Sequence, residues 1–303
     1  MYYCSMNLQI VSAIGALWMF MACNDNAQNQ SENNTMNRQD TVAEHASHYT
    51  QVNGIRMYYE IYGKGKPLVL LHGGGSTIHT TFGRIIPALA ENRQLIAVEL
   101  QGHGHSSDRD AGFTFEQDAD DVAALLKELK TGKVDVFGFS NGGTTALQLA
   151  IRHPDMVNKV IAASALFKRS GASPQFWEFM NQARIEHMPA QYKDEYRKVA
   201  PDPERLQVMH DKCAKRMAEF TDISDELISS VKAPVLLMNG DADVASTEHM
   251  AAMCKLIPHC QLAIFPGGHG KYIGEITTLT GDAAFRPYVV PVIEEFLDAA
   301  PAK

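Results

Sequence analysis

The sequence predicts an α/β fold in which a mostly parallel sheet is covered by helices on both faces. Between residues 46 and 300, short apolar runs of strand length alternate with longer segments whose apolar residues have helical spacing. Such alternation is typical of parallel strands joined by crossover helices. Polar, glycine-rich turns follow several of the apolar runs, so we expect reactive side chains at the carboxyl edge of the sheet.

The length and charge of the chain limit the classes of protein to consider. With 303 residues and a hydrophobic fraction of 45%, the chain can form one large domain, and no second domain is required. Its formal net charge of -8 argues against a nucleic-acid partner, because such proteins present a basic face.

Residues 1–22 are expected to be a signal peptide. They contain no charged side chain, and their apolar run from residue 8 to 22 is too short to span a bilayer comfortably. The run ends at Ala22-Cys23, which resembles the lipobox of bacterial lipoproteins, and this resemblance implies that Cys23 is lipidated. Phe20 departs from that pattern, in which an aliphatic residue is usual, and no Lys or Arg precedes the run. An ordinary cleaved signal and a short anchor are the alternatives.

Residues 23–45 are expected to be a flexible tether, because the segment is rich in Asn, Gln, Ser, Asp and Thr and almost free of apolar residues. A tether behind a lipidated cysteine suits an exported enzyme that its lipid holds in the bacterial envelope, at the periplasmic face or the cell surface. Without the lipid, the protein would be periplasmic or secreted.

Three cysteines belong to the folded part: Cys213, Cys254 and Cys260. An oxidising compartment would allow Cys254 and Cys260 to pair, since six residues can bridge a helix end and the next strand. The alternative is that both are free buried thiols.

The folded part opens with two strands, 48–52 and 55–62, which flank the hairpin signal Asn53-Gly54. Further strands are expected at 67–71, 95–100, 133–137, 159–163, 234–238 and 261–265. Helices are expected at 80–90, 115–129, 144–151, 247–256 and in a terminal segment that ends near residue 299.

The alternation breaks between residues 167 and 231, where the sequence is helical and polar-rich and contains no predicted strand. This segment follows the sixth strand, and we expect it to form a helical cap over the carboxyl edge of the sheet, where open α/β sheets bind ligands. About a third of its methionine and aromatic side chains should face a substrate, and the others should lie in the core. These side chains are Phe167, Phe176, Trp177, Phe179, Met180 and Met188.

Ser140 is the candidate nucleophile. It stands in the pattern Gly138-x-Ser140-x-Gly142, between the apolar strand at 133–137 and the helix at 144–151. In a nucleophile elbow, small residues beside the serine allow a strained turn that exposes the hydroxyl at a helix N-terminus. The pattern alone is weak evidence, and its strand and helix flanks make it strong.

A base and an acid follow Ser140 in the order serine, acid, histidine. A serine hydroxyl needs a base at neutral pH, and the base needs a third group to hold its tautomer and to stabilise its positive charge. Asp241 and Asp243 follow the strand at 234–238, and His269 follows the strand at 261–265. All of these side chains are therefore expected at the same edge of the sheet as Ser140.

Together these motifs resemble the α/β-hydrolase superfamily over residues from about 48 to 300. The matching motifs are the elbow, His-Gly-Gly-Gly at 72–75, Gly-Asp-x-Asp at 240–243 and Gly-Gly-His at 267–269. In that family the acid usually lies three residues after the glycine, which maps to Asp243 and leaves turn formation or capping to Asp241.

The resemblance also implies the backbone donors for the negative oxygen of the tetrahedral intermediate. These would be the amides of Asn141 and Gly74, in preference to those of Gly73 and Gly75. His72 begins this loop and is expected to form structural hydrogen bonds instead of acting as a second base.

His103 and His105 are not expected to bind a metal, because no set of carboxylates or cysteines stands near them in the sequence. Residues 99–106 instead resemble a strand-end turn of the family, with Glu99 where an aspartate is usual. The sequence gives no physical account of that substitution.

The sequence thus predicts a serine hydrolase that cleaves carboxylic esters or related small acyl compounds through an acyl-enzyme, without a cofactor. A serine at the elbow argues against dehalogenase and epoxide-hydrolase chemistry, for which relatives in this superfamily use an aspartate. An amidase or aminopeptidase, a carbon–carbon bond hydrolase, a lactonase and a perhydrolase would share the same motifs. The rival from another class is a hydrolase-fold binding protein without catalysis.

Overall fold

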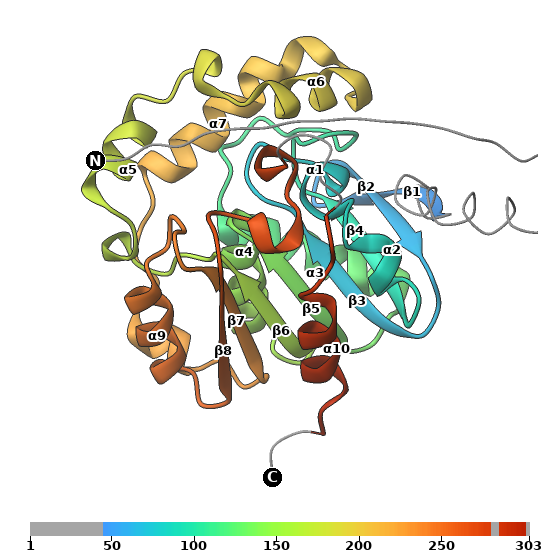
Figure 1. Cartoon of the computed structure of the whole chain (residues 1–303). Coiled ribbons are helices and arrows are strands. Elements are labelled where there is room, and N and C mark those ends of the chain that lie inside the picture. The colour runs from blue at the N-terminus through green and yellow to red at the C-terminus, as the bar shows by residue number, and fades with distance from the viewer. Residues whose placement is uncertain (1–44, 280–284, 301–303) are drawn as a thin grey trace, which may run out of the picture. The chain divides into compact units, whose positions relative to one another are not determined.

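The computed structural model describes residues 45–279 and 285–300 (Figure 1). The predicted signal peptide, the tether up to residue 44 and the lipidation site Cys23 lie outside these residues. No helix within the described ranges is long and apolar enough to cross a bilayer.

Eight strands form one sheet in the order β1-β2-β4-β3-β5-β6-β7-β8. The strands are β1 His45–Val52, β2 Ile55–Tyr62, β3 Lys66–Leu71, β4 Arg93–Glu99, β5 Val134–Phe139, β6 Val157–Ala163, β7 Val235–Gly240 and β8 Cys260–Phe265. The pairs β1–β2 and β2–β4 are antiparallel, and the other pairs are parallel. The predicted hairpin forms at Asn53 and Gly54, which both have positive φ, as the tight turn requires.

Helices cover both faces of the sheet. They are α1 Ile78–Phe82, α2 Ile86–Leu89, α3 Phe115–Leu129, α4 Asn141–Arg152, α5 Pro174–Asn181, α6 Ala190–Val199, α7 Leu206–Ala218, α8 Asp225–Ser229, α9 Thr247–Leu256 and α10 Val290–Asp298. Along β5, Val136 packs in the core on the α3, α4 and α9 side, whereas Phe137 packs with α1, α2 and α10 on the other. Burial on both faces explains why this strand reads as a continuous apolar run.

The single helix predicted at 80–90 is wrong, because the structure has two short helices there, α1 and α2. The chain turns between them at Gly83, and the Ile85 N–H donates to the Phe82 carbonyl oxygen. Pro87 then lies in the first turn of α2, a position that suits a residue without an N–H, whereas a helix interior does not.

Four helices, α5 to α8, lie between β6 and β7, and within this described stretch no strand interrupts them. Figure 1 shows α5, α6 and α7 grouped at one end of the sheet. A small apolar cluster that includes Phe113, Met188 and Met209 packs α6 and α7 against the loop before α3. We call residues 164–234 the inserted segment; its role as a cap stays a prediction.

A disulfide joins Cys254, near the end of α9, to Cys260, the first residue of β8, with their Cα atoms 5.3 Å apart. The pairing that the sequence left open is therefore present, and it fastens α9 to the last strand of the sheet. Cys213 is a free thiol on α7.

Candidate active site

Ser140 lies at the junction of β5 and α4 in a strained backbone conformation, with φ 54° and ψ -120°. A non-glycine residue rarely adopts positive φ, and such strain persists only where the surroundings enforce it. Here β5 ends at Phe139, α4 begins at Asn141, and the Ser140 N–H donates to the Ala163 carbonyl oxygen at 2.7 Å. This geometry turns the hydroxyl out of the sheet.

The two glycines of the elbow have no room for a side chain. A Cβ atom on Gly138 would lie 2.0 Å from the Gly142 carbonyl oxygen, and one on Gly142 would lie 2.1 Å from the Leu71 carbonyl oxygen. Both neighbours are backbone atoms, which cannot move aside. The spacing seen in the sequence is therefore a steric requirement of the close packing between α4 and the end of β3.

The structure brings Ser140, His269 and Asp243 together from the ends of three strands. His269 Nε2 lies 3.0 Å from Ser140 Oγ, and His269 Nδ1 lies 2.6 Å from Asp243 Oδ1. Because an ionised carboxylate only accepts, Nδ1 carries the proton and Nε2 can accept the proton of the Ser140 hydroxyl. The arrangement is that of a nucleophile, a base and an orienting acid.

Asp243 is buried and fully hydrogen-bonded. Its Oδ1 accepts from the Val244 N–H as well as from His269, and its Oδ2 accepts from the Gly240 N–H and from Ser164 Oγ. Burial acts to raise the pKa of this carboxyl, but the hydrogen bonds, led by that of His269, outweigh burial and hold the pKa below its usual value. Asp243 is therefore ionised and oriented.

Asp241, the alternative acid, is exposed and points into the turn. Its Oδ1 accepts from the Gly267 N–H at 2.8 Å, which ties the end of β7 to the loop that carries His269. The carboxylate that contacts His269 is the one that the sequence favoured, and Asp241 takes the turn-forming role.

The amides of Gly74 and Asn141 are available as oxyanion donors. Within the described residues, neither N–H has a hydrogen-bond acceptor, and both residues line the cavity beside Ser140. The neighbouring amides are engaged, because Gly73 N–H donates to Thr81 Oγ1 and Gly75 N–H donates to His103 Nε2. The structure thus agrees with the preference for Gly74 and Asn141, whose role in stabilising an oxyanion stays a prediction.

Two buried histidines hold this loop in place. His72 Nδ1 donates to the Gly73 carbonyl oxygen, and its Nε2 accepts from the Leu100 N–H. His103 Nδ1 donates to the Gln101 carbonyl oxygen, so its Nε2 is free to accept from Gly75. Burial lowers the pKa of His72 to about 4 and that of His103 well below its usual value, so both rings are neutral at neutral pH. Sequence reasoning missed the contact of His103, which joins residues far apart in the chain.

Glu99 stabilises the strand-end turn that it begins. Its Oε2 accepts from the His105 N–H at 2.5 Å and from His105 Nδ1 at 3.0 Å. Its carbonyl oxygen accepts from Ser106 Oγ. No cluster of three or more His, Cys, Asp or Glu side chains suited to a metal occurs in the described part of the chain.

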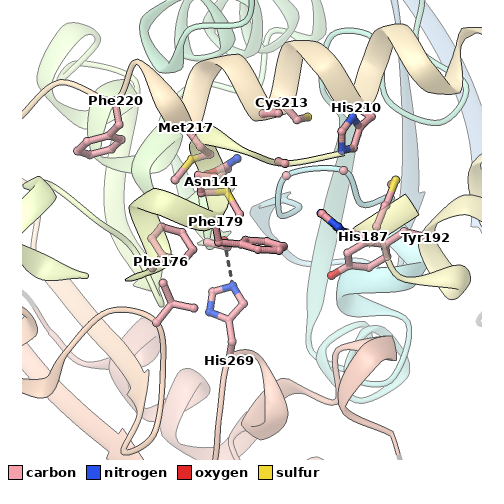
Figure 2. Close-up of a pocket in the computed structure, with 18 of the residues that line it drawn as sticks. Asn141, Phe176, Phe179, His187, Tyr192, His210, Cys213, Met217, Phe220 and His269 are labelled. Carbon is pink, nitrogen blue, oxygen red and sulfur yellow. Dashed lines mark hydrogen bonds between the residues drawn. The ribbon is translucent and has the colours of Figure 1, made fainter. Parts of the chain in front are cut away.

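A cavity of about 260 Å³ opens beside Ser140 and His269, and side chains from the inserted segment form much of its wall (Figure 2). The dashed line in Figure 2 marks the hydrogen bond of His269 to Ser140. Four of the six apolar side chains named at 167–188 line the cavity, which is more than the expected third, namely Phe176, Phe179, Met180 and Met188. Most of the six also lie in or against the apolar core, as expected, since Phe167, Trp177 and Met188 belong to buried clusters and Phe176 and Met180 pack against one.

Sequence reasoning also missed several polar residues of this cavity. Ser164, Arg184, His187 and His210 all line it. Ser164 directly follows β6, and the rule that ligand-binding residues follow parallel strands could have identified it. The other three lie further along the inserted segment, away from any strand end, where no sequence pattern marks them.

Comparisons with known proteins agree with this geometry. Residues 66–216 match the family model described as the alpha/beta hydrolase fold. The soluble epoxide hydrolase of Corynebacterium sp. (strain C12) is 39% identical over 113 residues, which make up 37% of this chain and only 39% of that protein. The serine hydrolase BPHL of Homo sapiens is 27% identical over 256 residues, covering 76% of this chain and 84% of that protein.

Among solved structures, a serine hydrolase involved in carbazole degradation, the CarC enzyme, has the same fold with a TM-score of 0.68. It is 22% identical and covers 84% of this chain and 99% of that chain. The order of the eight strands, the elbow geometry and these matches together identify the chain as a member of the α/β-hydrolase superfamily.

Proposed function

We propose that this hydrolase cleaves carboxylic esters or related acyl compounds through an acyl-enzyme formed on Ser140. The observation that carries the proposal is the unbroken chain of contacts from Ser140 Oγ to His269 and from His269 to Asp243, at 3.0 and 2.6 Å. The amides of Gly74 and Asn141 beside the serine supply donors that have no acceptor among the described residues.

In this mechanism, Ser140 Oγ attacks the carbonyl carbon while His269 Nε2 takes the hydroxyl proton. The Gly74 and Asn141 N–H groups donate to the oxygen that becomes negative in the tetrahedral intermediate. His269 then gives its proton to the departing alcohol. The bond between the carbonyl carbon and the alcohol oxygen breaks, and the acyl group stays on Ser140. A water molecule, deprotonated by His269, then attacks the acyl-enzyme in the same way. This step returns the proton to Ser140 and releases the carboxylic acid.

Replacing the nucleophile tests the proposal directly. Ser140→Ala should abolish hydrolysis of short p-nitrophenyl esters while the melting temperature changes little, because only one half-buried hydroxyl with a single hydrogen bond is lost. Hydrolysis that persists in the purified variant would refute the role of Ser140.

Amides, lactones and carbon–carbon bonds beside a carbonyl remain alternative targets of the same triad. They differ in the leaving group that His269 must protonate, so a panel of esters, amides, lactones and diketones ranks them by kcat/KM. A binding protein without catalysis is the rival of another class. Labelling of Ser140 by a fluorophosphonate probe would exclude it, because the probe reacts only with an activated serine.

We also propose that the N-terminal segment exports the protein and that a lipid on Cys23 anchors it in the bacterial envelope. The support is the uncharged apolar run of residues 8–22 directly before Cys23 and the polar segment that follows. Cys23→Ser should move the protein from the membrane fraction to the soluble fraction. Unchanged membrane association would count against lipidation.

A further inference from the structure

The cavity beside Ser140 has a basic side. Its wall includes Arg184, His187 and His210, all from the inserted segment, and none of the described residues that line it is Asp or Glu. Figure 2 shows His187, Tyr192 and His210 on one side of His269, and Phe176, Met217 and Phe220 on the other. The cavity therefore has an apolar side and a side with polar rings, and Arg184 adds one positive charge to its wall.

Arg184 supplies the permanent charge of this basic side. Arg184 is exposed, lines the cavity and has no carboxylate partner within the described chain. The planar guanidinium binds a carboxylate through two parallel hydrogen bonds. Beside such an exposed side chain, a bound anion keeps part of its hydration, so desolvation opposes binding less than it would at a buried site.

His210 lies on α7, with only 8% of its surface exposed. Its Nδ1 is 2.9 Å from Asp211 Oδ1, which accepts the Nδ1 proton. Nε2 has no hydrogen-bond partner among the described residues, although the ring lines the cavity. The neutral ring therefore presents Nε2 to the cavity as a hydrogen-bond acceptor, which suits a donor group of a ligand and not a carboxylate.

Asp211 and Glu275, which contact the lining residues His210 and Tyr192, are already engaged. Asp211 accepts from His210 Nδ1 and from Gln207 Nε2 at 2.7 Å. Glu275 accepts from the Tyr192 hydroxyl at 2.7 Å and from the Thr277 N–H at 2.9 Å. Neither carboxylate lines the cavity, so neither occupies the position in front of Arg184.

We infer that Arg184 and His187 form a subsite for a carboxylate at the end of the acyl chain remote from the scissile bond. The apolar half of the cavity would hold the methylene groups between that carboxylate and the carbonyl at Ser140. The substrate class is then the monoesters of dicarboxylic acids or acyl compounds of the same charge pattern. This inference rests on the proposed acyl hydrolysis at Ser140.

A pair of substrates that differ only at the remote end tests the subsite. The p-nitrophenyl monoester of adipic acid and p-nitrophenyl hexanoate have acyl chains of equal length, ending in a carboxylate and a methyl group. In Arg184→Met, the ratio of kcat/KM for the adipate monoester to that for the hexanoate should fall about tenfold, the usual worth of a charged hydrogen bond. An unchanged ratio would overturn the subsite.

Arg197→Met is the matched control. Arg197 is an exposed arginine on α6 that lies 3.7 Å from Asp194 and does not line the cavity. Its replacement removes the same charge from the same inserted segment and should keep the ratio of the unaltered protein. An equal fall in both variants would show a general effect of charge and would contradict a site at Arg184.

A binding measurement separates the subsite from the proposed catalysis. In Ser140→Ala, calorimetric titration with adipate should give a Kd that rises about tenfold when Arg184→Met is added. If the unaltered protein hydrolyses no ester, binding that depends on Arg184 would keep the subsite and refute the proposed function. Equal binding in both variants would refute the subsite even if esters are cleaved.

Discussion

Ser164 Oγ donates a hydrogen bond of 2.6 Å to Asp243 Oδ2, on the opposite side of the carboxylate from His269. The Tyr272 hydroxyl lies 2.7 Å from the same Ser164 oxygen. Ser164 is buried and has a φ of 51°, a strained conformation at the end of β6. Ser164 is thus a positioning residue that fixes the rotation of the Asp243 side chain.

Removing this hydroxyl should weaken catalysis without removing any reacting group. Ser164→Ala should lower kcat/KM for p-nitrophenyl esters by about fivefold, which corresponds to about 1 kcal/mol for one hydrogen bond. It should also raise the pKa of Asp243, because that bond helps to lower it. The acidic limb of the pH profile of kcat/KM should therefore move to higher pH.

Thr145→Val is the control for this change. The Thr145 hydroxyl is buried on α4 and has no hydrogen-bond partner in the described structure, so its loss should leave the pH profile in place. A Ser164→Ala variant with an unshifted profile would contradict the positioning role.

The contact of Gly142 with β3 predicts a severe packing defect. Gly142→Ala should lower the free energy of unfolding by about 3 kcal/mol or more, because its Cβ would lie 2.1 Å from the Leu71 carbonyl oxygen. Gly112→Ala, where a Cβ meets nothing within 4 Å, should change stability by less than about 0.5 kcal/mol. Urea unfolding of both variants measures the difference, and equal stability would disprove the steric requirement.

A buried ion pair joins the inserted segment to the main sheet domain. Arg216 on α7 lies 2.6 Å from Asp118 on α3, with the two side chains 3% and 2% exposed. Asp118→Ala would leave the guanidinium buried and unpaired, and should reduce the free energy of unfolding by about 3 to 5 kcal/mol.

Replacing both Asp118 and Arg216 with apolar residues should lower the free energy of unfolding much less than removing Asp118 alone. Burial raises the pKa of Asp118 to about 6 despite the attraction of Arg216, so ion pairing does not fully offset desolvation. Asp118→Leu combined with Arg216→Met should therefore recover most of the stability lost in Asp118→Ala. A double variant as unstable as the single one, in urea unfolding, would contradict this account.

Three buried histidines should make the fold sensitive to acid. Burial lowers the pKa of His72 and His249 to about 4 and that of His103 well below its usual value. Between pH 6.5 and 4, these histidines are protonated in the unfolded chain but stay neutral in the folded chain. The free energy of unfolding therefore falls as the pH falls. One such shift amounts to about 3 kcal/mol when complete.

Asp118 opposes this trend. Because its pKa is raised in the folded state, its contribution to the free energy of unfolding decreases as the pH rises from about 4 to 6. Comparing His249→Gln with the unaltered protein isolates one histidine. The loss of unfolding free energy from pH 7 to pH 5 should be smaller in the variant. An equal loss would show that His249 titrates normally in the folded state.

The main sheet could be predicted from the sequence because its inner strands are buried on both faces and several strands end in distinctive turns. The helices at 115–129 and 247–256 have the predicted bounds. Ser140, His269 and Asp243 follow strands of one sheet, so topology alone predicts that they meet. The predicted strand ends were less accurate. β1 begins at His45 instead of residue 48, and β4 begins at Arg93 instead of residue 95, because backbone pairing extends both strands beyond their apolar residues.

The lining of the cavity could not be predicted in the same way. Whether Phe179 or Arg184 faces the cavity depends on how short helices of the inserted segment pack, and no periodic pattern fixes that packing. The contact of Gly75 with His103 likewise joins two loops that are neighbours only through the pairing of β3 with β4.

The order of the elements along the chain has a consequence for its synthesis. Ser140 follows β5, whereas its acid and base follow β7 and β8, beyond the whole inserted segment. During synthesis, Ser140 therefore emerges from the ribosome long before β8 and the loop after it, which carries His269. Until that last strand has emerged and paired, the growing polypeptide has no base beside its serine, and the proposed hydrolysis cannot begin on a half-made chain.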